Sequence, residues 1–136
     1  MGIAVTVAVR LGMEQEPISI DVETHYLSDQ SDQDEARYVF AYTITIHNNG
    51  RMPVRLLTRR WLITDARGRI QRVSGDGVVG EQPTIMPGAF HRYSSFSVLE
   101  TPVGTMEGSY GMVDGEGDAF TAPIAAFRLA VPGIVH

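Results

Sequence analysis

The most β-rich run of the chain is Tyr38-Val-Phe-Ala-Tyr-Thr-Ile-Thr-Ile46. Its β-branched and aromatic side chains suit a pleated, buried surface, so the run predicts a central strand. An acidic loop at residues 27–37 separates it from Ile18-Ser-Ile20-Asp-Val22-Glu-Thr24-His-Tyr26, where apolar and polar residues alternate strictly. Such alternation indicates a half-buried antiparallel strand.

Short strands and turns continue through the rest of the chain. Turn chemistry at residues 48–50, 65–68, 87–88 and 114–117 separates strands expected at 54–64, 69–73, 90–98, 108–113 and 119–124, with an extension at 127–129. Pro123 places its strand near an edge or an end. Residues 1–16 predict an added edge strand or a loose arm, and an irregular crossing starts at Thr101-Pro102. Seven or eight strands without a helical period predict an all-β sandwich.

Length and composition limit the class of protein. With 136 residues, of which 43% are hydrophobic, the chain suits one domain over 1–136 with its core at roughly 15–130. The sequence has no cysteine, which excludes disulfides, thiolate zinc sites and a cysteine nucleophile. It has no apolar run of 18 residues, and its first positive charge, Arg10, follows the apolar residues. We therefore expect a cytoplasmic protein without membrane insertion.

Charge is distributed unevenly along the chain. The formal net charge is -5, with eight acidic residues and no arginine from Glu14 to Glu35, whereas Arg51 to Arg72 holds seven of the eleven cations. The molecule is therefore predicted to be electrically two-sided, and its acidic balance argues against nucleic acid as a partner. Every cation is an arginine. Codon bias in a G+C-rich genome and selection for forked recognition of carboxylates or phosphates both explain this.

A glycine segment, Ser74-Gly75-Asp76-Gly77-Val78-Val79-Gly80-Glu81-Gln82-Pro83, holds three glycines within six residues. Glycine permits a positive φ and close backbone approach, so we expect a ligand or partner loop. The spacing Gly-x-Gly-x-x-Gly matches a dinucleotide fingerprint, but Pro83 leaves no room for the helix which that fingerprint requires.

Two interpretations of the glycine segment stay open. In the first, the amides around Gly75, Gly77 and Gly80 form an anion-binding concavity beside Arg69 or Arg72. In the second, the segment is a stiff loop or protein docking site, with Val78 and Val79 over the core. The candidate binding residues are therefore Arg69, Arg72, Gly75, Gly77, Val78, Val79 and Gly80.

Other motifs point away from metal sites and catalysis. Asp114, Glu116 and Asp118 have the spacing that opens a calcium loop, but Ala119 and Ala125 stand where glycine and glutamate are required, so a hairpin turn is expected. The acidic loop at 29–35 is better explained as a solvated loop than as a weak cation site. His25, His47 and His91 have no histidine at close spacing, and Gly108-Ser109-Tyr110-Gly111 is one residue too short for a nucleophile motif. We expect no catalytic residues, no cofactor and no metal site.

Four segments together resemble the bacterial ApaG family: Leu57-Thr-Arg-Arg-Trp61-Leu-Ile-Thr-Asp65, Gly75-Asp-Gly77-Val-Val-Gly80-Glu-Gln-Pro83, Leu99-Glu-Thr-Pro-Val-Gly-Thr-Met106 and Gly108-Ser-Tyr110-Gly-Met-Val-Asp114. The resemblance spans roughly residues 15–130. It implies an immunoglobulin-like or fibronectin-type-III-like antiparallel sandwich with Trp61 in its core, and it assigns no role to Arg60.

The resemblance also shapes the functional hypotheses. The same domain occurs in certain eukaryotic F-box and polymerase-interacting proteins, which implies protein binding, and the bacterial family is associated with cobalt and magnesium resistance or efflux. Our first hypothesis is a non-enzymatic interaction domain with a protein partner. The alternatives are phosphate or nucleotide-pyrophosphate binding, with or without hydrolysis, and direct divalent-metal binding; the oligomeric state stays open.

Overall fold

The structure is a computed structural model that describes residues 5–10 and 17–133. Within these residues the chain forms nine strands and a single short 3-10 helix, Ser28–Gln30. The strands are β1 (Val5–Arg10), β2 (Ile18–Tyr26), β3 (Tyr38–Asn48), β4 (Val54–Asp65), β5 (Ile70–Asp76), β6 (Thr84–Ile85), β7 (Phe90–Leu99), β8 (Val103–Asp114) and β9 (Ala119–Ala130). Across the described part of the chain, no helix is long and apolar enough to cross a membrane.

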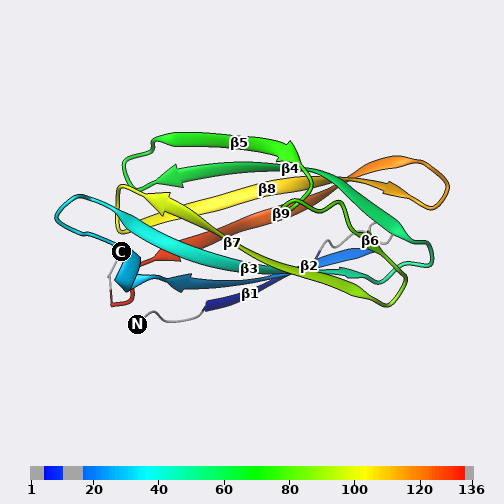
Figure 1. Cartoon of the computed structure of the whole chain (residues 1–136), viewed down its shortest axis with the longest axis horizontal. Helices are drawn as coiled ribbons and strands as arrows, with labels where there is room; N and C mark the ends of the chain where they lie inside the picture. Colours follow the sequence, from blue (N-terminus) through cyan, green and yellow to red (C-terminus); the bar gives the residue numbers. More distant parts are fainter. Residues whose placement is uncertain (1–4, 11–16, 134–136) are drawn as a thin grey trace.

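The strands form two antiparallel sheets. The first has the order β1-β2-β3-β7, and the second has the order β5-β4-β8-β9, with β6 paired to β4. Figure 1 shows the two sheets as layers, with β5 and β4 at the top and β1 and β2 at the bottom. This arrangement confirms the expected all-β, immunoglobulin-like sandwich.

The core lies between the sheets and is built by alternation along each strand. Ile20 and Val22 on β2 pair with Ile46 and Ile44 on β3, and all four are buried. Trp61 on β4 is 4% exposed, which confirms the prediction that it lies in the core. Its indole makes edge contacts with Tyr42, Phe127 and Tyr110, as expected for packed aromatic rings.

The sandwich is closed on one side and open on the other. On the closed side, β9 contacts β2 and β1. On the open side the two edge strands are β5 and β7, which end their respective sheets. Pro123 lies in β9, the other edge strand of the second sheet, which confirms its predicted position near an edge.

Several strand limits differ from the sequence prediction. The expected irregular crossing after Thr101 is wrong, because β8 begins at Val103 and is paired on both sides, with β4 and β9. Glycine and polar residues hid this half of the strand; a Cβ at Gly104 would lie 2.6 Å from the Thr64 carbonyl oxygen, so close packing requires the glycine. In addition, β5 continues to Asp76, so the first residues of the glycine segment are strand.

The edge strand expected near the N-terminus is present in the described residues. Residues 5–10 form β1, which pairs with β2 at the edge of the first sheet. Residues 1–4 and 11–16 lie outside the described residues.

Candidate functional site

The glycine segment forms a tight turn after β5. Val78 and Glu81 exchange two backbone hydrogen bonds, of 2.8 and 3.0 Å, and the residues between them have positive φ, 48° at Val79 and 77° at Gly80. Positive φ at both central positions is the signature of a type I′ turn. A positive φ is unusual for any β-branched residue, so Val79 is held in a strained conformation.

Three backbone donors of this turn are already used inside the domain. The Gly77 amide donates to the Leu57 carbonyl at 2.8 Å, while the amides of Val78 and Glu81 bond within the turn. Gly77 has φ 66°, and a Cβ there would overlap the carbonyl oxygen of Glu81. The turn geometry therefore accounts for Gly77 and Gly80, and the engaged amides do not point to a bound anion.

The two valines of the turn have opposite environments. Val78 is fully buried in the core, as the docking-loop interpretation expects. Val79 is 62% exposed, so the expectation that it also covers the core is wrong. The type I′ turn is the cause, because it reverses the chain between the two side chains. The turn thus displays one large apolar side chain to solvent.

Arg55 and Arg59 lie beside the glycine segment: Arg55 donates to the Gln82 carbonyl at 3.1 Å, and Arg59 lies at Gly75. Arg59 is half-buried on β4, where it faces Gly75 of β5 in the strand pairing. A Cβ at residue 75 would lie 2.8 Å from Nη1 of Arg59, so glycine provides the space for the guanidinium. Nη1 donates to the carbonyl oxygens of Asp76, at 3.0 Å, and Gly77, at 3.1 Å. Sequence reasoning missed Arg59, because only the strand register brings it to Gly75.

A groove runs along the open side of the sandwich. It consists of two adjoining hollows, of about 290 and 330 Å³, that share Tyr42, Arg59, Trp61 and Ser95. One hollow lies between β5 and β7, from Val73 to Val98, and the other reaches the glycine turn at Val79. We call this feature the edge groove. Its floor combines aromatic rings with hydroxyl groups and one guanidinium, as small recognition sites do.

The tyrosines of the edge groove are neutral over the ordinary pH range. Burial raises the pKa of Tyr42, although a hydrogen bond with Ser95 and the charge of Arg59 act in the opposite direction. Burial also raises the pKa of Tyr93 and of Tyr110, whose hydroxyl groups are hydrogen bonded to each other at 2.5 Å. The tyrosines therefore add no charge to the groove, whose charged lining residues are Arg59 and, at the glycine turn, Asp76.

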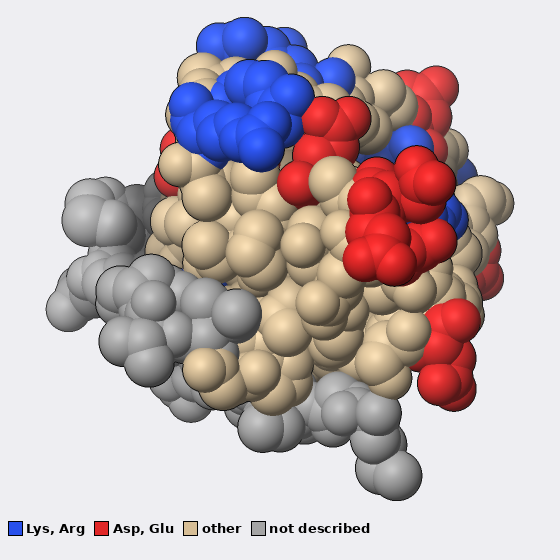
Figure 2. Space-filling view, turned by 90° about the vertical axis from the view of Figure 1, so that its left-hand side faces the viewer, with Lys and Arg blue, Asp and Glu red and all other residues tan. Residues whose placement is uncertain are grey.

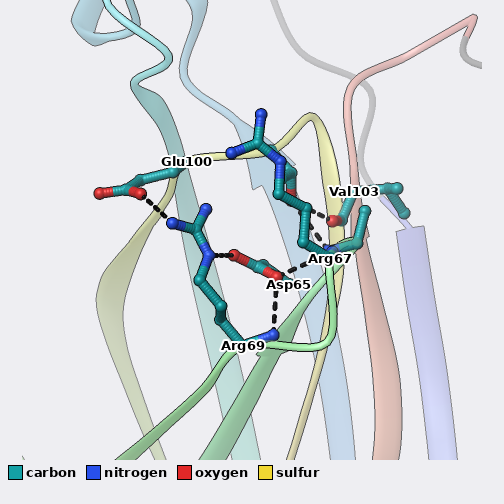
Figure 3. Close-up of polar contacts among 7 residues, drawn as sticks. Asp65, Arg67, Arg69, Glu100 and Val103 are labelled. Atoms are coloured by element: carbon teal, nitrogen blue, oxygen red, sulfur yellow. Dashed lines mark hydrogen bonds and ion pairs between the residues drawn. The ribbon is translucent and has the colours of Figure 1, made fainter.

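Arg69 lies far from the glycine turn, at the opposite end of β5. Figure 3 shows its Nε bonded to Asp65, at 2.8 Å, and its Nη1 bonded to Glu100, also at 2.8 Å. The Glu100 pair joins the β4–β5 hairpin to the β7–β8 turn, as does the Ala66 amide, which donates to Thr101 Oγ1 at 3.0 Å. The structure thus gives Arg69 a structural role at this hairpin and does not bring it to the glycine turn.

Asp65 is the acceptor at the centre of this hairpin. Its Oδ1 accepts the amides of Arg67, at 2.8 Å, and Arg69, at 3.0 Å. Partial burial raises the pKa of Asp65, but those amides and the Arg69 guanidinium outweigh it, so the pKa lies below its ordinary value. The same carboxylate raises the pKa of Arg69.

Arg72 is also away from the turn. It is exposed on β5 opposite Leu62, on the outer face of the second sheet, and it lines a separate hollow with Arg60. Arg69 and Arg72 therefore do not lie beside the glycine turn, contrary to the expectation. Chain separation was a poor guide because a strand carries its residues away from the turn at about 3.3 Å each.

The acidic segment and the arginine-rich segment lie on different sheets, although both sheets carry both signs. The described acidic residues from Asp21 to Glu35 lie on β2 and in the loop that follows it, whereas Arg55, Arg59, Arg60 and Arg72 lie on β4 and β5. Figure 2 faces the end that carries the β4–β5 hairpin and shows basic side chains clustered at the top, with acidic side chains to the side. The molecule therefore has the two-sided charge that its sequence predicts.

The histidines and the Asp114 turn are the remaining candidate metal ligands. His25 pairs with Glu23 at 2.7 Å and His47 with Asp21 at 2.9 Å. Asp114 Oδ1 accepts the amides of Glu116, at 2.9 Å, and Asp118, at 3.1 Å, which is the expected hairpin turn. No group of three or more histidine or acidic side chains that could hold a metal ion occurs among the described residues.

Two antiparallel sheets packed face to face and open along one pair of edge strands define an immunoglobulin-like β-sandwich domain. The chain belongs to the ApaG domain family, which it matches over residues 28–114. It is 56% identical over 119 residues to Protein ApaG of Shewanella halifaxensis, covering 88% of this chain and 94% of the relative. The same values hold for Protein ApaG of Azotobacter vinelandii.

Solved structures agree with this assignment. An X-ray structure of a structural genomics target shares 49% sequence identity and superimposes with a TM-score of 0.84, over 88% of this chain and 91% of that chain. A crystal structure described as an ApaA protein from Bordetella pertussis shares 44% identity with a TM-score of 0.84, over 86% of this chain and 95% of that chain.

Proposed function

We propose that the chain is a non-catalytic, cytoplasmic interaction domain that binds an extended segment of a partner protein in the edge groove. Arg59 is the observation on which this proposal depends. Its half-buried guanidinium donates to two carbonyl oxygens, and it forms no ion pair with a carboxylate among the described residues. A cation in that position attracts an acidic group from outside the domain.

The strands on either side of Arg59 favour an extended partner. Both β5 and β7 are edge strands, so each presents unpaired backbone groups along its outer side. An extended peptide can add to such an edge through backbone hydrogen bonds, while its alternate side chains enter pockets. Large apolar side chains are exposed along these edges and at the turn: Ile70, Val79, Phe96 and Val98.

Arg59 also sets the chemistry of the partner. A hydrogen bond to a charged group contributes about 1.5–3 kcal/mol, more than a neutral one, because the ionised group strengthens it. The bound segment therefore has an Asp or Glu side chain over Arg59, with apolar residues on either side for Trp61 and Val79. Phosphate or pyrophosphate at the turn is the competing hypothesis, and it has less support because the amides of Gly77 and Val78 already donate within the domain.

In this proposal, any link to cobalt or magnesium comes from the partner protein and not from metal binding by this domain. Asp114 uses Oδ1 for two amides of its own turn, so its carboxylate has a structural role. Millimolar magnesium is then expected to leave the melting temperature unchanged. A site with a dissociation constant a hundredfold below the ligand concentration adds about 2.7 kcal/mol, so a reproducible rise that Asp114→Asn removes supports direct metal binding instead.

Site-specific photo-crosslinking in living cells tests the proposed function. A photoreactive amino acid replaces Val79, at the end of the edge groove, or Thr121, an exposed residue of β9 outside the hollows of the groove. We expect a discrete protein adduct at residue 79 and none at residue 121. Mass spectrometry of the adduct is expected to identify an acidic segment with alternating apolar residues.

A second substitution makes the crosslinking result specific to the groove. Arg59→Gln is expected to remove the adduct, while Arg60→Gln on the opposite face of the same strand retains it. Equal adducts at both crosslinker positions, or an adduct that survives Arg59→Gln in a folded protein, contradict the proposal. Loss of the adduct on addition of millimolar pyrophosphate, together with saturable pyrophosphate binding, supports the anion hypothesis in its place.

A further inference from the structure

Another hollow, of about 540 Å³, lies on the outer face of the second sheet and shares only Trp61 and Val73 with the edge groove. We call it the outer hollow. It forms where the pairing of β8 with β9 shifts register between Met106 and Gly108. Such a bulge increases the local twist and bends the sheet. Small residues at this point, Gly108, Ala125 and Ala126, leave the surface concave.

Gly108 has a specific reason to be glycine. A Cβ at this position would overlap the carbonyl oxygen of Arg60 and lie 3.0 Å from Cε3 of Trp61. The bulge, and hence the outer hollow, therefore depends on close approach of β8 to β4. The outer hollow is therefore a feature of the sheet itself and not of a loop.

Two arginines lie side by side along the outer hollow. Arg60 pairs with Ser74 across β4 and β5, and Arg72 pairs with Leu62, so the two guanidinium groups belong to diagonal neighbours on one face. Diagonal positions are about 7–8 Å apart, within reach of long side chains. Neither arginine forms an ion pair among the residues that the structure describes. Two neighbouring cations repel each other, and a bound anion removes that repulsion.

The lining of the outer hollow also has an apolar part. Leu62, Ile124 and the two alanines of the bulge supply it, and Glu107 lies beyond Leu62 in the same cross-strand row. The volume falls within the range of about 300–1,000 Å³ for small-molecule sites, which combine apolar walls with a few charged groups. Arg60 on β4 has Arg72 of β5 and Glu107 of β8 as diagonal neighbours, so two cations and one carboxylate surround the apolar part.

We propose that the outer hollow binds a small organic anion, with its acid group between Arg60 and Arg72 and its apolar body against Leu62 and the alanines. The acid group is a phosphate or a carboxylate, both of which match a forked guanidinium. Glu107 repels a ligand that is only an anion and accepts a hydrogen bond from a ligand that has a donor at its far end. The arginines and the carboxylate of this site do not line the edge groove, and the proposal does not depend on the proposed function.

NMR titration of the isotope-labelled full chain tests the outer hollow with defined probes. Phenyl phosphate and phenylacetate are expected to give saturable shifts at residues 60–62, 72–74, 107–108 and 124–126. Inorganic phosphate, which lacks the apolar body, and benzyl alcohol, which lacks the charge, are expected to bind at least about tenfold more weakly. Either acid group alone supports the site, and the comparison identifies which one it prefers.

Charge substitutions test the contribution of each side chain to phenyl phosphate binding. Arg60→Gln and Arg72→Gln are each expected to weaken phenyl phosphate binding by about tenfold, the loss of a charge-assisted hydrogen bond. Glu107→Gln is expected to strengthen it. Arg128→Gln, an exposed residue of β9 outside the hollow, is the matched control and is expected to change nothing. Absence of saturable shifts, equal weakening by Arg128→Gln, or weaker binding in Glu107→Gln overturns the proposal.

Discussion

Gly75 faces Arg59 across the β4–β5 pairing, and the absence of a side chain at Gly75 gives the guanidinium its position in the edge groove. A Cβ there would lie 2.8 Å from Nη1, which is the mobile end of a flexible side chain. Gly77 differs, because a Cβ there would overlap backbone atoms at a φ of 66°. Gly75 thus provides space for a side chain, whereas Gly77 is required by the backbone conformation.

This difference predicts different effects of two alanine substitutions on partner crosslinking. Gly75→Ala displaces the guanidinium and weakens its two carbonyl hydrogen bonds, so we expect a loss of about 1 kcal/mol in unfolding free energy together with reduced partner crosslinking. Gly77→Ala strains the backbone and is expected to cost about 1–3 kcal/mol, with crosslinking reduced only as far as folded protein is lost. Chemical denaturation and crosslinking of both variants measure the contrast. Crosslinking by Gly75→Ala that falls only in proportion to lost folded protein contradicts the contrast.

Trp61 is predicted to be a major contributor to stability. It is 4% exposed and contacts three aromatic rings, so Trp61→Ala leaves a large cavity and is expected to cost about 3–5 kcal/mol. Urea denaturation measures this loss. The native fluorescence is expected to be blue-shifted and weakly quenched by acrylamide; a red-shifted, readily quenched spectrum contradicts the buried position.

Asp65 predicts acid sensitivity of the β4–β5 hairpin. Because its folded-state pKa is lowered, the carboxylate stabilises the fold above the unfolded value of about 4 and loses that effect as pH falls through the folded value. Asp65→Asn is therefore expected to lower the melting temperature at neutral pH and to flatten its decline in acid. Asp29→Asn in the exposed acidic loop is the control. Identical acid profiles for wild type and Asp65→Asn contradict this role.

Tyr93 and Tyr110 predict alkaline unfolding. Their pKa values are raised by burial, so they stabilise the fold below the unfolded tyrosine value of about 10 and lose that effect as pH rises above it. Tyr93→Phe cannot ionise at residue 93, and we expect a shallower alkaline decline of stability. It also leaves the Tyr110 hydroxyl without its partner, at a cost of about 1–3 kcal/mol near neutral pH. A circular dichroism melt at each pH checks both effects, and an unchanged alkaline slope counts against them.

Much of the fold was predictable because local patterns and long-range pairing agree. The alternation from Ile18 to Tyr26 and the β-branched run from Tyr38 to Ile46 both became paired strands. Local signals were weaker where pairing depends on small residues. Gly104 lies in the segment expected to be irregular chain, yet close packing against β4 requires a glycine there.

The candidate site was less predictable, because it depends on which side chains meet across strands. The glycine segment was expected to be a loop, and it forms a tight turn after β5; the cations beside it are Arg59 and Arg55, from the preceding strand. Arg69 and Arg72, close in sequence, lie at another end and on another face. Strand register decides such contacts, and register is not visible from spacing along the chain.

Binding of a synthetic peptide with the sequence of the crosslinked segment tests the central claim most directly. Isothermal titration with wild type, Arg59→Gln, Arg59→Lys and Arg60→Gln is combined with hydrogen exchange of the β5 and β7 amides. We predict saturable binding that protects amides of an edge strand, about tenfold or greater weakening in Arg59→Gln, partial retention in Arg59→Lys and wild-type affinity in Arg60→Gln. Equal affinity of wild type and folded Arg59→Gln, or protection confined to residues outside β5 and β7, would contradict the account.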